Sequence, residues 1–156
     1  MTVRLARVED AEALWRVHVA SIRRLCAGWY SRDEIEAWTA RLAPGGYVAA
    51  MATHALVVAE EAGAVTGFGE LDAERAEVVA VYVAPDAAGR GVGATLLARL
   101  EAMAREGGIA WLTLCASLNA EGFYARHGWR PIGRERQPVG DTVAVDCVRM
   151  EKRVAA

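Results

Sequence analysis

The feature that most constrains this chain is a strand followed at once by a glycine-rich loop and an amphipathic helix, over residues 81–97. The loop has glycine at three alternating positions, Gly89, Gly91 and Gly93. Glycine lets the backbone approach a ligand closely, and the first turn of a helix presents unpaired N–H groups with partial positive charge. This combination predicts a site for an anionic, phosphate-like group, and Arg90 adds a full positive charge to the loop.

The composition is that of an ordinary globular protein. Of the 156 residues, 54% are hydrophobic and 24% are charged, so we expect residues 1–156 to form a single domain. The formal net charge is -2 and no dense block of Lys and Arg occurs, which argues against a nucleic-acid partner. No apolar stretch approaches the ~20 residues of a membrane span, and the N-terminus has no signal-peptide core. We therefore expect a cytoplasmic protein that binds no membrane.

The cysteines and histidines show no metal-binding pattern. Cys26, Cys115 and Cys147 are far apart in the sequence, no Cys-x-x-Cys occurs, and the 3 histidines do not fall at metal-ligand spacings. Small buried thiols in a reducing compartment are the simplest interpretation. We therefore predict no metal and no disulfide.

Hydrophobic periodicity and turn signals predict the element order βααβββαβαββ. The expected strands span residues 3–8, 55–60, 65–71, 77–83, 111–116, 129–136 and 142–150. The first expected helix follows Asp10 and ends at Gly28, and the second is opened by the capping box Ser31–Glu34 and stopped by Pro44-Gly45-Gly46. The others run from about residue 91 to 106 and from Asn119 to Gly128. Short connections between the three central strands predict antiparallel neighbours, hence a mixed α/β fold.

The glycine loop alone leaves the phosphate carrier open. Gly89-x-Gly91-x-x-Ala94 also fits the loose dinucleotide-binding pattern of an oxidoreductase. That pattern requires an acidic residue at the end of the next strand, and residues 113–117 offer none. A Walker-type loop is excluded because no Lys-Ser/Thr pair follows the glycines.

A second motif, Asn119 to Trp129, places an amide (Asn119) and a phenol (Tyr124) on a short helix after the glycine loop. Together with Gly89-Arg90-Gly91-Val92-Gly93, it resembles the GNAT superfamily of acyl-CoA-dependent N-acetyltransferases. The resemblance covers nearly the whole chain in element order. It implies a mixed α/β fold of the α+β type, with a mixed, mostly antiparallel sheet and helices on both faces.

The resemblance also implies which residues bind acetyl-CoA, the expected acyl donor. The pyrophosphate would be held by backbone N–H groups of Gly89, Arg90, Gly91, Val92, Gly93 and Ala94. The pantetheine arm would run beside Val81, Tyr82 and Val83, and the Tyr124 hydroxyl would point at the sulfur. Asn119 would contact the pantetheine or stabilise this region. One departure is Ala88, where the family usually has Arg or Gln, and we expect it to weaken binding at most.

Acetyl transfer to an amine needs a neutral amine, stabilisation of the oxyanion and a proton for the departing thiolate. The resemblance implies direct attack by a primary amine within a ternary complex. Tyr124 is the predicted general acid, with core packing as its alternative role. Glu77 is the first candidate for the general base, because superfamily members that acetylate lysine side chains have a glutamate at this position; an exposed carboxylate at the end of a strand is its alternative role. Glu70 on the preceding strand is the second candidate.

A further family variant places its base on the strand before the asparagine. The corresponding residue here is Leu114, which cannot accept a proton, so that variant is excluded.

The acceptor is less constrained by the sequence than the donor. Trp29 and Tyr30, between the first two helices, could wall an acceptor pocket, pack under the helix pair or lie at a subunit interface. Glu70, Asp72 and Glu77 would give the cleft a negative potential suited to a cationic amine. We expect a small-molecule or amino-acid-like amine as acceptor.

Two further questions stay open on the sequence. A non-catalytic acyl-CoA-binding module is the main alternative to an enzyme, although the presence of both Tyr124 and an acidic candidate argues against it. The 5 tryptophans and the high apolar content are compatible with a homodimer.

Overall fold

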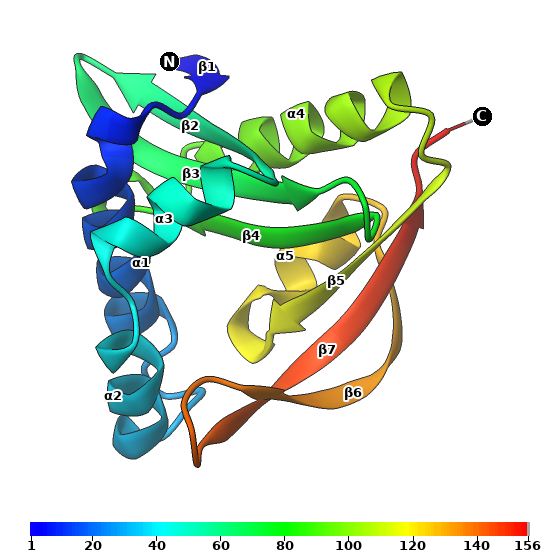
Figure 1. The fold of residues 1–156 in the computed structure, drawn as a ribbon. Helices are drawn as coiled ribbons and strands as arrows, with labels where there is room; N and C mark the ends of the chain where they lie inside the picture. The colour runs from blue at the N-terminus through cyan, green and yellow to red at the C-terminus, as the bar shows by residue number, and fades with distance from the viewer. Residues whose placement is uncertain (156) are drawn as a thin grey trace.

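A computed structural model describes residues 1–155 and contains a single seven-stranded sheet, in the order β1-β2-β3-β4-β5-β7-β6 (Figure 1). The strands are β1 (Thr2–Leu5), β2 (Ala55–Glu61), β3 (Ala64–Asp72), β4 (Glu77–Val83), β5 (Trp111–Ser117), β6 (Arg130–Pro138) and β7 (Ala144–Arg153). All neighbouring strands are antiparallel except β4 and β5, which are parallel. The predicted mixed, mostly antiparallel sheet is therefore confirmed.

Helices cover both faces of this sheet, as Figure 1 shows. The helices are α1 (Ala11–Leu25), α2 (Arg32–Ala40), α3 (Pro44–Met51), α4 (Val92–Glu106) and α5 (Glu121–Arg126). The first three lie on one face, and α4 and α5 lie on the other. None of the helices in residues 1–155 has both the length and the apolar character needed to cross a membrane.

Alternation along the strands divides the core between these two faces. On β2, Leu56 and Val58 pack with residues of α1 and α3, whereas Val57 and Ala59 pack with residues of α4. Successive side chains of a strand point to opposite faces, so a strand buried on both sides reads as a continuous apolar run. Residues 56–59 form such a run, and all four side chains are at most 3% exposed.

One helix, α3, is absent from the predicted order. We expected Pro44-Gly45-Gly46 to stop the second helix, but α2 already ends at Ala40 and Pro44 is the first residue of α3. Proline suits the first turn of a helix, where its missing N–H would have no partner. Tyr47 then packs its ring against Phe68 on β3, with centroids 5.8 Å apart. Tertiary packing therefore outweighs the low helix propensity of the two glycines.

Local signals were accurate at α2 and less so at α5. The Ser31 hydroxyl accepts from the Glu34 backbone N–H (3.1 Å), and the Glu34 carboxylate accepts from the Ser31 N–H (2.9 Å), as the capping box predicts. Asn119 was the predicted cap of α5, but it lies in a 3-10 turn at 118–120 and Ala120 precedes the helix.

The predicted absence of a disulfide is wrong, because Cys115 and Cys147 are bonded, with their Cα atoms 5.7 Å apart. They lie on β5 and β7, where the register pairs Ser117 with Cys147 and Cys115 with Arg149, so the cysteines are diagonal neighbours. The sequence separation of 32 residues concealed this proximity, which only the pairing of the strands creates. Cys26 is free and buried, as predicted.

Opening the Cys115–Cys147 disulfide is expected to lower the free energy of unfolding by about 3–4 kcal/mol, because a cross-link over 32 residues restricts the unfolded chain. For a chain of this size the corresponding fall in Tm is roughly 6–16 °C. Thermal unfolding with and without dithiothreitol measures it. The double variant Cys115→Ser/Cys147→Ser is the control, since its Tm must not respond to the reductant. Finding all 3 cysteines as free thiols in denatured, unreduced protein would contradict the disulfide.

Candidate active site

The candidate site forms where β4 and β5 separate. The two strands pair only at Glu77 and Thr113, whereas β4 pairs with β3 along its whole length. In the β3–β4 register Glu70 faces Ala80 and Leu71 faces Val78, which leaves Val79 as an extra residue of β4. Such a bulge bends its strand. Beyond the bulge, the edge of β4 toward β5 has no strand partner for its backbone groups.

The first cavity, here the loop cleft, has a volume of about 390 Å³ and lies between the end of β4, the loop before α4 and the start of α5. Its lining includes nearly all residues predicted to bind the donor: Val81, Tyr82, Val83, Gly89, Gly91, Val92, Gly93, Ala94 and Asn119. Ala88, the departure from the family pattern, also lines it. The glycine loop and the later helix motif, distant in sequence, are therefore brought to one cleft.

The backbone at the start of α4 requires glycine. Gly89 and Gly91 have φ angles of +78° and +83°, in the left-handed region that favours glycine, and a Cβ at either position would meet only open space. A Cβ on Gly93 would lie 3.2 Å from the Phe123 ring, so glycine there allows α4 and α5 to approach each other. The loop therefore leaves room for a ligand at the helix start.

Two predicted donor-binding residues do not line the loop cleft. The exposed Arg90 side chain donates to the Asp86 carbonyl (3.2 Å) on the outside of the loop. Tyr124 is buried behind the cleft instead of on its surface, with 6% exposure. Asn119 does line the cleft, and its Oδ1 accepts from the Cys26 thiol (3.4 Å).

The loop cleft also contains residues to which the sequence assigned no role. Phe123, Arg126 and His127 from the region of α5 line it, as do Ser21, Leu25 and Cys26 at the end of α1. Arg126 and His127 belong to the second motif, so their basic character was a signal for an anionic ligand. The contribution of α1 had no local signal, because it depends on how the helix lies across the sheet.

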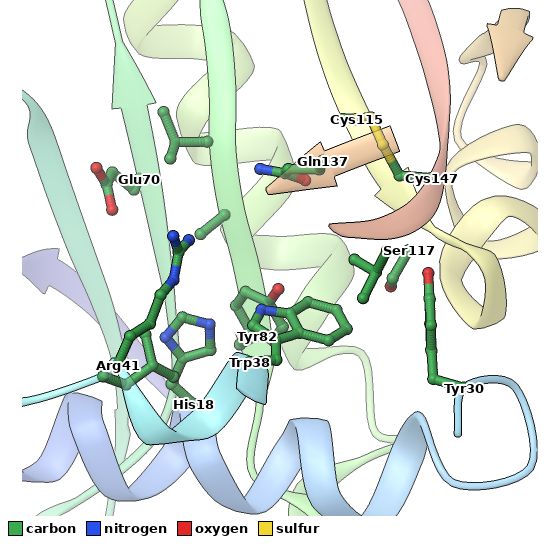
Figure 2. A pocket seen from close by; sticks show the side chains of 14 residues that line it. His18, Tyr30, Trp38, Arg41, Glu70, Tyr82, Cys115, Ser117, Gln137 and Cys147 are labelled. Carbon is green, nitrogen blue, oxygen red and sulfur yellow. A yellow bond between two sulfur atoms is a disulfide. The ribbon is translucent and has the colours of Figure 1, made fainter. Parts of the chain in front are cut away.

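The second cavity, here the α2 cavity, has a volume of about 130 Å³ and lies between α1, α2 and the middle of the sheet (Figure 2). Glu70 on β3 lines it, together with Trp38 and Arg41 from α2 and His18 from α1. The far side is formed by β5, β6 and β7, and includes the Cys115–Cys147 disulfide.

The loop cleft and the α2 cavity adjoin each other. Tyr82 and Ser117 line both, and a narrow gap between β4 and β5 shares residues with each of them. Tyr124 lines this gap. Burial raises the pKa of the Tyr124 phenol above its ordinary value.

Glu70 is held in place by a histidine. Its Oε2 lies 2.6 Å from Nδ1 of His54, and the other ring nitrogen lies 3.3 Å from Oδ2 of Asp72. The Glu70 and Asp72 side chains are each 12% exposed. The arrangement orients a shielded carboxylate at the edge of the α2 cavity.

Glu77, the first candidate for the base, lines neither cavity. It lies at the closed end of the β4–β5 pair, and its carboxylate accepts from the Arg149 guanidinium at 2.7 Å. Arg149 also binds Glu135 (2.8 Å), which holds the pKa of the Glu135 carboxyl below its ordinary value. Glu77 is thus paired with a cation away from the junction of the cavities.

The two aromatic residues predicted at the acceptor site lie in different environments. Trp29 is 57% exposed and lines neither cavity. Tyr30 lines the α2 cavity, and its hydroxyl donates to the Asp146 carbonyl (2.6 Å) and accepts from the Leu118 N–H (2.9 Å). Tyr30 therefore ties the segment after α1 to β7 and to the turn after β5.

Neither a nucleophilic thiol nor a metal ligand set is evident among residues 1–155. Burial raises the pKa of the Cys26 thiol to about 12, so it stays protonated at neutral pH. Cys115, Cys147 and Glu135 offer ligand atoms within 4.8 Å of one another, but both sulfurs are in the disulfide and Glu135 is paired with Arg149. Sulfur binds metals as a thiolate, so we assign no metal to this group.

Several solved structures share this architecture. A protein from Rhodopseudomonas palustris, described as a GCN5-related N-acetyltransferase and class-II aminotransferase, is 31% identical with a TM-score of 0.91, covering 97% of this chain and 94% of that one. YncA from Salmonella typhimurium, solved with acetyl-CoA, is 26% identical with a TM-score of 0.68, covering 99% and 94%. The PaiA N-acetyltransferase of Thermoplasma acidophilum, solved with coenzyme A, is 22% identical with a TM-score of 0.80, covering 98% and 99%.

The sequence of this chain matches a known family model, although it matches no curated protein. The family model described as the acetyltransferase (GNAT) domain matches residues 26–154, which include the glycine loop, the second motif and both cavities' strand walls. This chain belongs to the GNAT acetyltransferase family.

Proposed function

We propose that this protein transfers the acetyl group of acetyl-CoA to the nitrogen of a small primary amine, by direct attack within a ternary complex. The observation that carries the proposal is the junction of the two cavities at the β4–β5 gap. The loop cleft suits an elongated phosphate-bearing donor, the α2 cavity suits a small acceptor, and Tyr124 lies between them.

The loop cleft fits acetyl-CoA through its backbone. The left-handed glycines and the start of α4 present N–H groups to a pyrophosphate, and Arg126 adds positive charge. The free edge of β4 at residues 81–83 can hydrogen-bond an extended pantetheine arm as a strand would. One of its N–H groups is also the proposed donor to the oxyanion. When bound, acetyl-CoA supplies an activated thioester carbonyl.

Glu70 is the proposed general base. An alkyl amine is largely protonated at neutral pH and must lose a proton before it attacks. Glu70 lines the α2 cavity and is oriented by His54, whereas Glu77 is paired with Arg149 outside both cavities. The geometry therefore favours the second candidate of the sequence over the first.

Tyr124 is the proposed general acid, which donates a hydrogen bond to the departing sulfur as negative charge develops on it. The phenol lines the gap between the cavities, and burial raises its pKa further above neutral pH. No covalent acyl-enzyme is proposed, since Cys26 is held as a buried thiol and the other two cysteines are bonded to each other.

A thermal shift tests the donor. Acetyl-CoA or CoA at about a hundred times its Kd is expected to stabilise the protein by roughly 2.7 kcal/mol, hence roughly 5–11 °C in Tm. NAD and ATP at the same concentration are the controls and are expected to give no comparable shift. A shift with NAD alone would instead favour a dinucleotide enzyme, and no shift with acetyl-CoA would contradict the proposed donor.

Thiol release separates an enzyme from a binding module. With acetyl-CoA and a panel of primary amines, we expect CoA to appear only when an acceptor is present. Stabilisation by acetyl-CoA without amine-dependent thiol release would support the non-catalytic module.

A further inference from the structure

The α2 cavity contains two side chains of opposite charge. Among its lining residues, Glu70 is the only acid and Arg41 the only arginine or lysine. His18 also lines it, but burial, together with the nearby charge of Arg41, lowers the pKa of His18 to about 3. The imidazole is therefore neutral at physiological pH, and the charges that an acceptor meets are one carboxylate and one guanidinium.

Arg41 has no partner of its own. It caps the C-terminus of α2, and within residues 1–155 its guanidinium forms no hydrogen bond or ion pair, whereas Glu70 is held by His54. Figure 2 shows the Arg41 side chain beside His18, with its guanidinium toward Glu70. A guanidinium presents donors in a fixed fork that matches the two oxygens of a carboxylate. The Arg41 guanidinium therefore faces the cavity, and its N–H groups have no hydrogen-bond partner among the described residues.

His18 offers a second unpaired group beside Arg41. Its Nδ1 lies 2.8 Å from the Tyr47 hydroxyl, and its Nε2 is buried with no hydrogen-bond partner among the described residues. If the Tyr47 hydroxyl donates to Nδ1, the neutral ring carries its hydrogen on Nε2. A buried polar atom without a partner is costly, so Nε2 favours a ligand that places a polar atom at the same end of the cavity as Arg41.

We propose that the acceptor is an amino acid or a close analogue, whose carboxylate binds Arg41 while its amine lies toward Glu70. This inference rests on the proposed acetyl transfer and adds the chemical class of the acceptor. The cavity volume of about 130 Å³ is below the roughly 300–1,000 Å³ typical of drug-sized ligands, so the acceptor is small. Trp38 and Tyr82 supply aromatic surface for its side chain.

Matched pairs of acceptors test the carboxylate. CoA release is measured with the common amino acids and with the primary amide of each, which keeps the amine and the side chain but removes the negative charge. For the best acceptor, the acid is expected to exceed its amide in kcat/KM by about 10- to 100-fold, with most of the difference in KM. Equal kcat/KM for acids and amides across the panel would overturn the inference.

Arg41→Gln tests the residue. The variant is expected to lose the preference for the acid, with kcat/KM for the amide changed little. Arg99→Gln is the matched control, because it removes the same charge from an exposed position on α4 that lines neither cavity. If Arg41 served only to position Glu70, Arg41→Gln would lower kcat equally for acid and amide, which would also overturn the inference.

Binding separates this inference from the proposed function. The Tm of the CoA-loaded protein is measured with each amino acid and its amide, in the original chain and in Arg41→Gln. Stabilisation by an acid, but not by its amide, that Arg41→Gln removes would support the anion site even if no acceptor were acetylated. That result would contradict the proposed function alone. If no amino acid stabilised the protein, the inference would be overturned, even if amines that lack a carboxylate were acetylated.

Discussion

Glu70→Gln is expected to lower kcat by about 10²- to 10⁴-fold, the usual contribution of a general base. The amide keeps the shape of the side chain and can still accept a hydrogen bond from His54, which lies 2.6 Å from the carboxylate. It cannot take the proton of the acceptor amine. The residual rate should rise with pH as more of the acceptor loses its proton to solvent. Initial rates of CoA release across a pH series measure both effects.

Glu77→Gln is the matched control for Glu70. It makes the same chemical change on the neighbouring strand, at a carboxylate that is paired with Arg149 and lines neither cavity. Its kcat and its pH profile are expected to stay close to those of the original chain. An equal loss in both variants would point to a general effect of charge, and a loss confined to Glu77→Gln would restore Glu77 as the base.

Tyr124→Phe is expected to lower kcat by about 10²-fold with little change in the affinity for acetyl-CoA. The hydroxyl lies in the gap between the cavities, and the residue does not line the loop cleft. A thiol is a stronger acid than a phenol, so Tyr124 assists by donating a hydrogen bond as charge develops on the sulfur. The effect should therefore fall near the lower end of the range for acid–base catalysis.

The Tyr124→Phe measurement needs two controls. The Tm of the variant shows whether the core around residue 124 is intact, since the ring packs against Phe123 and Trp129. The thermal shift with CoA shows whether the donor still binds. Unchanged kcat in a folded, CoA-binding variant would leave Tyr124 as a packing residue only.

Features encoded over short stretches could be predicted from the sequence. The capping box at Ser31 and the glycines before α4 act within a few residues. The structure has the predicted capping hydrogen bonds at Ser31 and the predicted glycine loop before α4. Helix α3 was missed because its local signal has two meanings. Pro44 both ends and begins helices well, and burial of Tyr47 against β3 decides between the two.

Contacts between distant segments could not be predicted. The disulfide depends on the register of β5 against β7, which no residue near Cys115 reveals. The choice between Glu70 and Glu77 depends in the same way on which carboxylate faces the α2 cavity and which meets Arg149, a residue 72 positions away from Glu77.

By itself, the sequence determined the GNAT type of fold, the glycine loop with its helix and the pair of motifs that points to an acyl-CoA donor. Only the tertiary structure decided that β4 and β5 part after Glu77, that two cavities meet at this gap, and that Arg41 and Glu70 line the same cavity. The physical reason is the distance along the sequence between the residues that interact. Backbone conformation and caps are set by neighbouring residues, whereas a site for two substrates arises from strand register and helix placement, which sum many weak contacts across the chain.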